Sequence, residues 1–125
     1  MKVLVCGSRK WLKRAPIERE LRKLPPGPET TLINGGAQGA DAIATDVARE
    51  LGFTVRRYFA QWGRYGKKAG PLRNSEMLEK EHLPEEPIDQ VLAFADDFSQ
   101  KYAPGTNDML KKSRAKGIPV EPFSF

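Results

Sequence analysis

Short, mainly apolar runs alternate with segments of helical periodicity along the whole chain. The runs are typical of strands buried on both faces of a parallel sheet, and they occupy residues 3–6, 31–33, 53–55, 91–94 and 118–120. Apolar positions with helical spacing lie between them, within residues 17–24, 40–51, 72–78 and 105–116. We expect a long loop from Ala60 to Gly70, with Pro71 as the first residue of the helix that follows.

This alternation predicts an α/β fold. We expect residues 1–125 to form a single Rossmann-like domain of three layers. About five parallel strands should form its middle layer, with right-handed crossovers that place helices on both faces. Ligands of such sheets bind at the carboxyl ends of the strands. The residues that directly follow each strand are therefore the candidates for function.

Composition narrows the function classes. The 125 residues are 39% hydrophobic and 30% charged, which is enough for one core and an ordinary surface. No apolar run could span a bilayer, and the single Cys6 cannot form an internal disulfide, so we expect a cytoplasmic protein without membrane contact. One histidine and one cysteine do not make a conventional zinc site, and we expect no metal or cofactor. The net charge of +5 suits an anionic ligand.

Glycine-containing loops follow the first two predicted strands. In Gly7-Ser8-Arg9, the glycine lets the backbone come close to a ligand, and the serine hydroxyl and the arginine guanidinium can bind phosphate. The alternative is a turn in which Ser8 caps a helix. The segment Gly35–Asp41 begins a helix, where exposed amides and the helix dipole favour an anion. Its GGxxG spacing is not the dinucleotide fingerprint. Asp41 could accept a hydrogen bond from a ribose hydroxyl or simply interact with the dipole of its helix.

Two later helices begin with similar chemistry. Arg73 and Asn74 are expected in the first turn after Pro71, where they can face the strand ends. Gly105 and Thr106 begin the last helix with a flexible backbone and a hydroxyl group. Since the carboxyl ends of parallel strands share one edge of the sheet, these segments are expected to converge with the first two loops.

Aromatic residues near these loops are candidates to stack on a base. Trp62 and Tyr65 lie in a basic segment just before Pro71, and Trp11 follows the first loop. We expect Trp62 to pack beneath the loop, which leaves Trp11 or Tyr65 for stacking.

The ordered set VLVCGSRKW, INGGAQGADAIATDVARELG, AQWGRYGKKAGPLRNSEML and PGTNDM resembles the SLOG superfamily of Rossmann-like nucleotide-binding proteins. Within that superfamily, the chain is most similar to the small YspA-like branch. The resemblance covers nearly the whole chain and implies a five-stranded parallel sheet with a phosphate-binding edge formed by these loops.

Two better-known branches suggest activities. The Lonely-guy phosphoribohydrolases cleave the N-glycosidic bond of nucleoside monophosphates, and their helix carries an arginine and a methionine that look like Arg73 and Met77. Their PGGxGTxxE motif resembles Pro104–Thr106, but its glutamate falls on Met109, and Asp108 is expected about 100° away around the helix. The DNA-processing protein A family binds single-stranded DNA, and its glycine loops and arginine-asparagine pair resemble the corresponding segments here.

We therefore expect the chain to bind a nucleotide or nucleotide derivative (a nucleoside phosphate or an ADP-ribose-like molecule) as a sensor or sequestering protein. The first alternative is an N-glycoside hydrolase, for which Arg73 and Asp108 are the candidate catalytic residues. The second is single-stranded nucleic-acid binding, and a homodimer is the expected assembly. The candidate ligand-binding residues are Gly7, Ser8, Arg9, Gly35, Gly36, Gly39, Asp41, Arg73, Asn74, Gly105 and Thr106.

Overall fold

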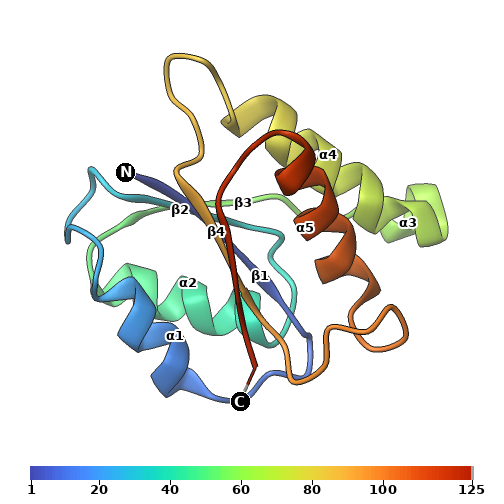
Figure 1. Ribbon diagram of the computed structural model, residues 1–125, viewed down its shortest axis with the longest axis horizontal. Helices are drawn as coiled ribbons and strands as arrows, with labels where there is room; N and C mark the ends of the chain where they lie inside the picture. The colour runs from blue at the N-terminus through green and yellow to red at the C-terminus, as the bar shows by residue number, and fades with distance from the viewer. Residues whose placement is uncertain (125) are drawn as a thin grey trace.

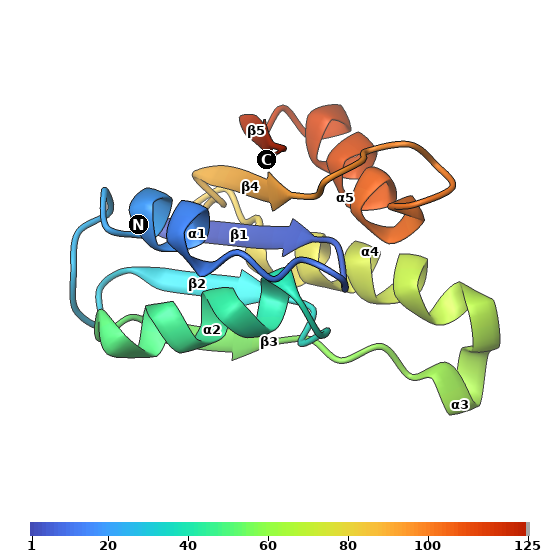
Figure 2. The same ribbon diagram turned by 90° about the horizontal axis from the view of Figure 1, so that it is seen from below.

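Strand β1 (Lys2–Gly7) lies in the middle of a five-stranded parallel sheet with the strand order β3-β2-β1-β4-β5. The computed structural model describes residues 1–124. The other strands are β2 (Thr31–Asn34), β3 (Thr54–Arg57), β4 (Gln90–Phe94) and β5 (Val120–Phe123). All strands are parallel, and the arrowheads of β1 to β4 in Figure 2 point the same way. The predicted α/β fold with five parallel strands is confirmed.

Helices cover both faces of this sheet (Figure 1). They are α1 (Arg14–Leu21), α2 (Ala40–Glu50), α3 (Trp62–Tyr65), α4 (Ala69–Glu81) and α5 (Pro104–Ala115), with a short 3₁₀ helix at Gly66–Lys68. The chain adds strands on one side of β1 as far as β3, and then returns to its other side for β4 and β5. Because crossovers are right-handed, this reversal places α1 and α2 on one face and α4 and α5 on the other.

Successive side chains of the central strand β1 point alternately into the two halves of the core, one on each face of the sheet. Val3 and Val5 pack with the apolar residues of α1 and α2. Leu4 points the other way and packs with those of α4 and α5, including Met77 and Met109. A strand buried on both faces needs apolar residues at every position, which is why the runs in the sequence are continuous.

The segment predicted as a long loop is partly helical. It contains α3 and the 3₁₀ helix, and α4 begins at Ala69, so Pro71 is the third residue of its helix and not the first. A helix tolerates proline here because its first four amides have no partner within the helix. Arg73 and Asn74 consequently lie in the second turn, not in the first.

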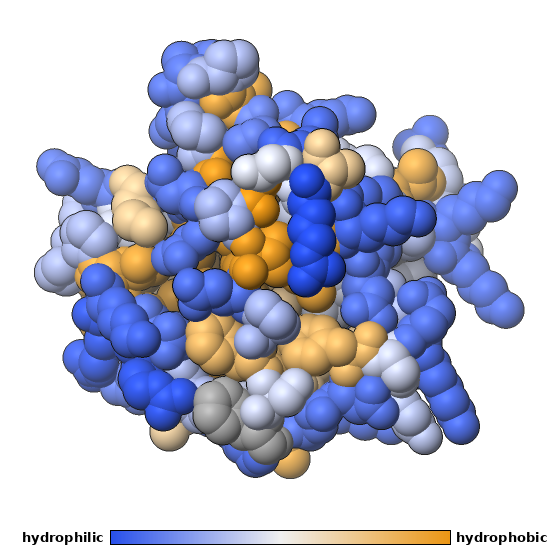
Figure 3. Space-filling model, viewed as in Figure 1, coloured by the Kyte–Doolittle hydropathy of each residue, from blue (hydrophilic) through white to orange (hydrophobic). Residues whose placement is uncertain are grey.

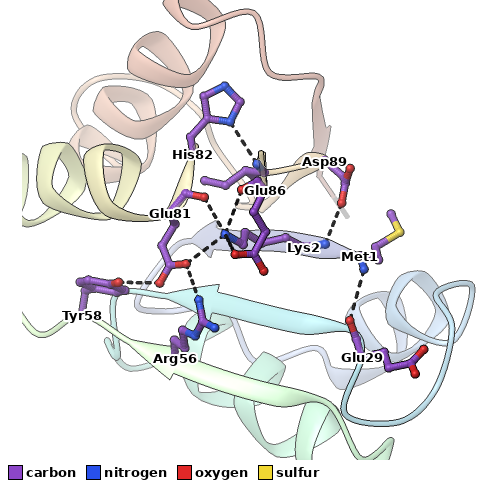
Figure 4. A network of polar contacts seen from close by, with 10 residues as sticks. Met1, Lys2, Glu29, Arg56, Tyr58, Glu81, His82, Glu86 and Asp89 are labelled. Atoms are coloured by element: carbon purple, nitrogen blue, oxygen red, sulfur yellow. Dashed lines mark hydrogen bonds and ion pairs between the residues drawn. The ribbon is translucent and has the colours of Figure 1, made fainter. Parts of the chain in front are cut away.

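A network of polar contacts around the buried Lys2 and Glu81 attaches the end of α4 to the sheet (Figure 4). The Nζ atom of Lys2 lies 3.3 Å from Oε1 of Glu81, and Nη1 of Arg56 donates to the same oxygen at 2.7 Å. The hydroxyl of Tyr58 donates to Oε2 of Glu81 at 2.5 Å. Burial acts to raise the pKa of Glu81, but the hydrogen bonds from Tyr58, Arg56 and Lys2 and the charge of Arg56 together keep the pKa below its ordinary value. The network fixes the helix that carries Arg73 and Asn74.

The edge strand β5 is the part of the sheet nearest to the viewer in Figure 1. The space-filling model in the same view, Figure 3, shows apolar surface in its middle, framed by hydrophilic side chains. β5 begins two residues later than predicted and includes Pro122, which cannot donate a hydrogen bond to a further strand.

Within residues 1–124, no helix is both long and apolar enough to cross a membrane.

Candidate functional site

A cavity of about 860 Å³ lies beyond the carboxyl ends of β1 and β4. These neighbouring strands flank the point where the chain reverses its direction across the sheet, which is where open α/β sheets bind ligands. Of the candidate ligand-binding residues identified from the sequence, those that line the cavity are Gly7, Ser8, Arg9, Gly35, Asp41, Arg73, Asn74, Gly105 and Thr106. Gly36, Gly39, Trp11 and Tyr65 are absent from the lining.

The loop after β1 is bound tightly to its neighbours. The amide of Ser8 donates to the carbonyl of Phe94 at 2.8 Å, and the carbonyl of Ser8 accepts from the amide of Ala40 at 3.1 Å. The Ser8 hydroxyl accepts from the amide of Lys10 at 3.0 Å, so Ser8 both lines the cavity and stabilises its own turn. Gly39 has a φ of +73° and lies against the carbonyl of Ser8, where a Cβ would not fit. Its role is therefore to let α2 begin close to this loop.

The amides of the second glycine loop are already used inside the protein. The amides of Gly35 and Ala37 donate to Oδ2 of Asp41 at 3.1 and 3.2 Å. The amide of Gly36 donates to Oδ1 of Asn34 at 2.8 Å. Gly35, Gly36 and Gly39 were expected to offer backbone donors to a ligand, but the amides of Gly35 and Gly36 are engaged within the protein. A carboxylate of the chain itself occupies the place that an anion was expected to take.

Asn34 is a structural residue that the sequence reasoning missed. It is fully buried at the end of β2, and its Nδ2 donates to the carbonyl of Asp41 at 3.1 Å and to the hydroxyl of Thr45 at 2.8 Å. Its position directly before the two glycines could have indicated this role, because asparagine side chains often accept hydrogen bonds from backbone amides two residues further along the chain.

Asp41 is buried at the edge of the cavity with one oxygen unused. Among residues 1–124, its Oδ1 has no hydrogen-bond partner. Burial raises the pKa of Asp41 to about 6, although the amide hydrogen bonds and the nearby Arg73 act against this shift. Its carboxyl group is thus poised to change its charge just below neutral pH.

Arg73 reaches from α4 to the ends of β2 and β3. Its Nη1 donates to the carbonyl of Gly35 at 2.8 Å and to that of Tyr58 at 3.3 Å, and its Nε donates to Oδ1 of Asn74 at 3.0 Å. Burial lowers the pKa of Arg73, and the nearby Asp41 acts against this shift. No described residue accepts a hydrogen bond from Nη2 of this guanidinium, so a donor remains for an anion in the cavity.

The structure reverses the expected roles of two neighbouring residues on α5. Met109 is fully buried in the core between α4, α5 and the sheet, whereas Asp108 lines the cavity. The prediction that Asp108 would lie off the functional face is therefore wrong. Its Oδ2 accepts a hydrogen bond from Nδ2 of Asn74 at 3.0 Å and forms an ion pair with Lys112 at 2.8 Å. Asn74 also donates to the carbonyl of Gly105 at 3.1 Å, so its amide group joins α4 to α5.

The amino-terminal end of α5 opens into the cavity. Pro104 is the first residue of this twelve-residue helix, and Gly105 and Thr106 follow it in the lining. The first amides of a helix lack partners within it, and the helix dipole makes this end attractive to anions. The loop 95–103, which precedes it, is the long orange loop of Figure 2.

The aromatic residues are arranged differently from the prediction. Trp11 is only 1% exposed, and its indole N–H donates to the carbonyl of Lys13 at 2.7 Å, so it cannot stack on a ligand. Tyr65 is exposed but does not line the cavity. Trp62, which was expected to pack beneath the loop, is 45% exposed and lines the cavity, with the Arg9 guanidinium 4.9 Å from its ring centroid.

Charges of both signs surround the cavity. The basic lining residues are Arg9, Lys10, Lys67, Arg73 and Lys101, and the acidic ones are Asp41, Asp96, Asp97 and Asp108. No group of three or more His, Cys, Asp or Glu side chains within residues 1–124 could hold a metal ion. This mixture is suited to a small molecule that has both an anionic group and hydroxyl groups.

Comparison with known proteins points to one family. Residues 1–65, which include the first two loops and Trp62, match the family described as YspA, cpYpsA-related SLOG. The Gene 61 protein of Mycobacterium phage D29 is 37% identical over 131 residues, covering 98% of this chain and 95% of the phage protein. No solved structure matches the chain significantly.

Proposed function

Because the chain belongs to the YspA, cpYpsA-related SLOG family, we propose that its cavity binds a nucleotide or a nucleotide derivative. The observation that carries this proposal is the convergence of the α5 amino terminus, Arg73 and Arg9 on one cavity at the reversal point of the sheet. Its volume of about 860 Å³ is within the usual range for small-molecule sites.

The phosphate would bind at the beginning of α5. There the amides of Gly105 and Thr106 and the Thr106 hydroxyl supply donors, and the guanidinium of Arg73 approaches from α4. This differs from the arrangement expected from the sequence, in which the loop at 35–39 held the phosphate. That loop is occupied by Asp41, so its contribution would be to the shape of the cavity.

The carboxylates would face the sugar. Asp41 and Asp108 lie in the same lining, and carboxylate oxygens accept hydrogen bonds from ribose hydroxyls. Because Oδ2 of Asp108 is already held by Asn74 and Lys112, its orientation is fixed before a ligand arrives. A site of this kind recognises and retains its ligand, which is the property that a sensor or sequestering protein needs.

Titration calorimetry tests the proposal directly. The ligands are AMP, GMP, CMP, UMP and ADP-ribose, each added to the wild type and to the variants R9A and R73A. We expect at least one of them to bind the wild type, and both variants to bind it more weakly. The variant R49A is the control, because Arg49 is exposed in the last turn of α2 and outside the cavity. Absence of binding across the panel, or equal binding by all variants, would contradict the proposal.

A second candidate function is cleavage of an N-glycosidic bond. The observation that favours it is Asp108, which lines the cavity together with Asp41, whose pKa is raised to about 6 by burial. Cleavage of this bond develops positive charge on the sugar, which a carboxylate stabilises, and a second carboxyl group with a raised pKa can transfer a proton. Incubation of the wild type and D108N with nucleoside monophosphates, followed by chromatography for free base, separates this function from simple binding.

A further inference from the structure

Trp62 occupies an unusual position for a residue of its size. It belongs to the four-residue helix α3, which lies at the end of the molecule, away from the sheet (Figure 2). The ring is 45% exposed, whereas the other tryptophan, Trp11, is 1% exposed. Since Trp62 also lines the cavity, part of its exposed surface borders the space that a ligand would enter.

Contacts on two sides hold the ring in this position. The guanidinium of Arg9, from the loop after β1, lies 4.9 Å from the ring centroid. On another side, the ring edge lies close to Gly70, where an added Cβ would be 3.3 Å from Cη2. The ring is therefore supported by Gly70 of the following helix and by Arg9, which is distant in sequence, and it keeps its place at the cavity before any ligand is present.

A second exposed aromatic ring lies in the same lining. Tyr102, in the loop before α5, is 60% exposed. Neither phosphate nor ribose has an aromatic face to stack on such rings. A nucleobase does, because its flat face stacks on an indole or phenol ring. Aromatic rings left exposed at a cavity that also contains guanidinium groups fit a ligand with a planar base at one end and a phosphate at the other.

We propose that the ligand must carry an aromatic base, and that Trp62 is the platform on which this base stacks. The inference rests on the proposed function and names the residue that recognises the base of the nucleotide. Arg9, which approaches the same ring, keeps it at the cavity and contributes positive charge for the phosphate.

The test compares nucleotides with ribose 5-phosphate, which has the same sugar and phosphate but no base. Calorimetry measures the dissociation constants of AMP, GMP, CMP, UMP and ribose 5-phosphate for the wild type, W62A, W62F and Y65A. Tyr65 is the matched control, since it is an exposed aromatic residue of the same helix that does not line the cavity. Loss of one base stack weakens affinity about tenfold.

We expect the wild type to bind one or more of the nucleotides at least tenfold more tightly than ribose 5-phosphate, and W62A to lose that preference. Y65A should bind like the wild type, and W62F should keep most of the preference. The fluorescence of the wild type should be quenched by the preferred nucleotide, and W62F should lose this response because its remaining tryptophan is buried. Equal binding of nucleotides and ribose 5-phosphate by the wild type, or a W62A variant that binds both more weakly by the same factor, would overturn the inference while the phosphate site stands. If neither kind of ligand binds the wild type, the proposed function itself fails.

Discussion

The guanidinium of Arg73 donates a 2.8 Å hydrogen bond from Nη1 to the carbonyl oxygen of Gly35, directly over the glycine. A Cβ atom placed on Gly35 would lie 2.6 Å from Cζ of Arg73. The glycine is therefore required by the arginine that covers it, and not by a positive φ. The second glycine loop and α4 are thus joined through a residue of the candidate site.

The substitution G35A should act by displacing the Arg73 side chain. The far end of a flexible side chain can move at small cost, so we expect the variant to fold and to bind nucleotides more weakly by the same factor as R73A. The double variant should be no weaker than either single one, because both changes remove the same guanidinium from its place. Calorimetry on the four proteins measures this coupling. The control is G63A, whose added methyl group meets no atom within 4 Å; independent, additive effects of G35A and R73A would contradict the relationship.

The charge of Arg73 should matter for affinity. A hydrogen bond to a charged group is worth about 1.5–3 kcal/mol, so R73A should weaken nucleotide binding by about tenfold or more. R73K should restore only part of the loss, since an ammonium group cannot form the planar fork that a guanidinium presents to phosphate. Dissociation constants from calorimetry decide the result. Full affinity in R73K would mean that positive charge alone is needed.

Asp41 should make the free energy of unfolding depend on pH. Burial raises its pKa in the folded protein to about 6, from its ordinary value of 3.8, so the folded state binds more protons than the unfolded state between these values. Its contribution to stability is therefore largest below pH 4 and is lost as the pH rises through 6. From the size of the shift, the loss is about 3 kcal/mol.

The variant D41N isolates this effect, because an amide keeps the shape and the acceptor of the carboxyl group but does not titrate. Urea denaturation of wild type and D41N at pH 4, 5, 6 and 7 measures the free energies of unfolding. The wild type should lose stability relative to D41N as the pH rises. A constant difference across this range would show that the carboxylate is not penalised by burial.

Asp108 decides between binding and catalysis. We expect the wild type to release little or no free base from nucleoside monophosphates, because the carboxylate is held by Asn74 and Lys112 within the cavity wall. Chromatography after prolonged incubation measures the release. Rapid release that disappears in D108N, while K111A, a change at an exposed residue of the same helix outside the cavity, retains its activity, would establish the hydrolase instead.

The salt dependence of binding separates a nucleotide from a nucleic acid. Binding of single strands weakens with salt with a log–log slope of about −0.7 for each phosphate contact. Because the cavity lining has five basic and four acidic residues, we expect the shallow slope of one or two phosphate contacts, and no tight binding of oligonucleotides. Affinity for an oligothymidylate and for AMP, measured from 50 to 300 mM salt, tests this. A steep slope for the oligonucleotide without binding of AMP would favour the nucleic-acid alternative.

The sequence by itself determined the sheet and the edge at which the cavity lies. Runs such as residues 3–6 are continuous because strands of a parallel sheet are buried on both faces, and this signal is local. Crossover connections bring all carboxyl ends to one edge, so the glycine loops that follow the strands had to converge there. The family resemblance followed from the same segments, and it is confirmed by the match over residues 1–65.

Only the tertiary structure decided which side chains face the cavity. Asp108 and Met109 are neighbours in sequence, and the rotation of α5 about its axis, set by its packing on α4 and the sheet, directs one to the cavity and the other to the core. The two tryptophans exchange their expected roles for a similar reason, since Trp11 packs against Phe94 while Trp62 is held outside the core by Arg9 and Gly70. Spacing along the chain fixes the residue types at this edge, but the direction of each side chain depends on contacts with residues far away in sequence, and these exist only in the folded protein.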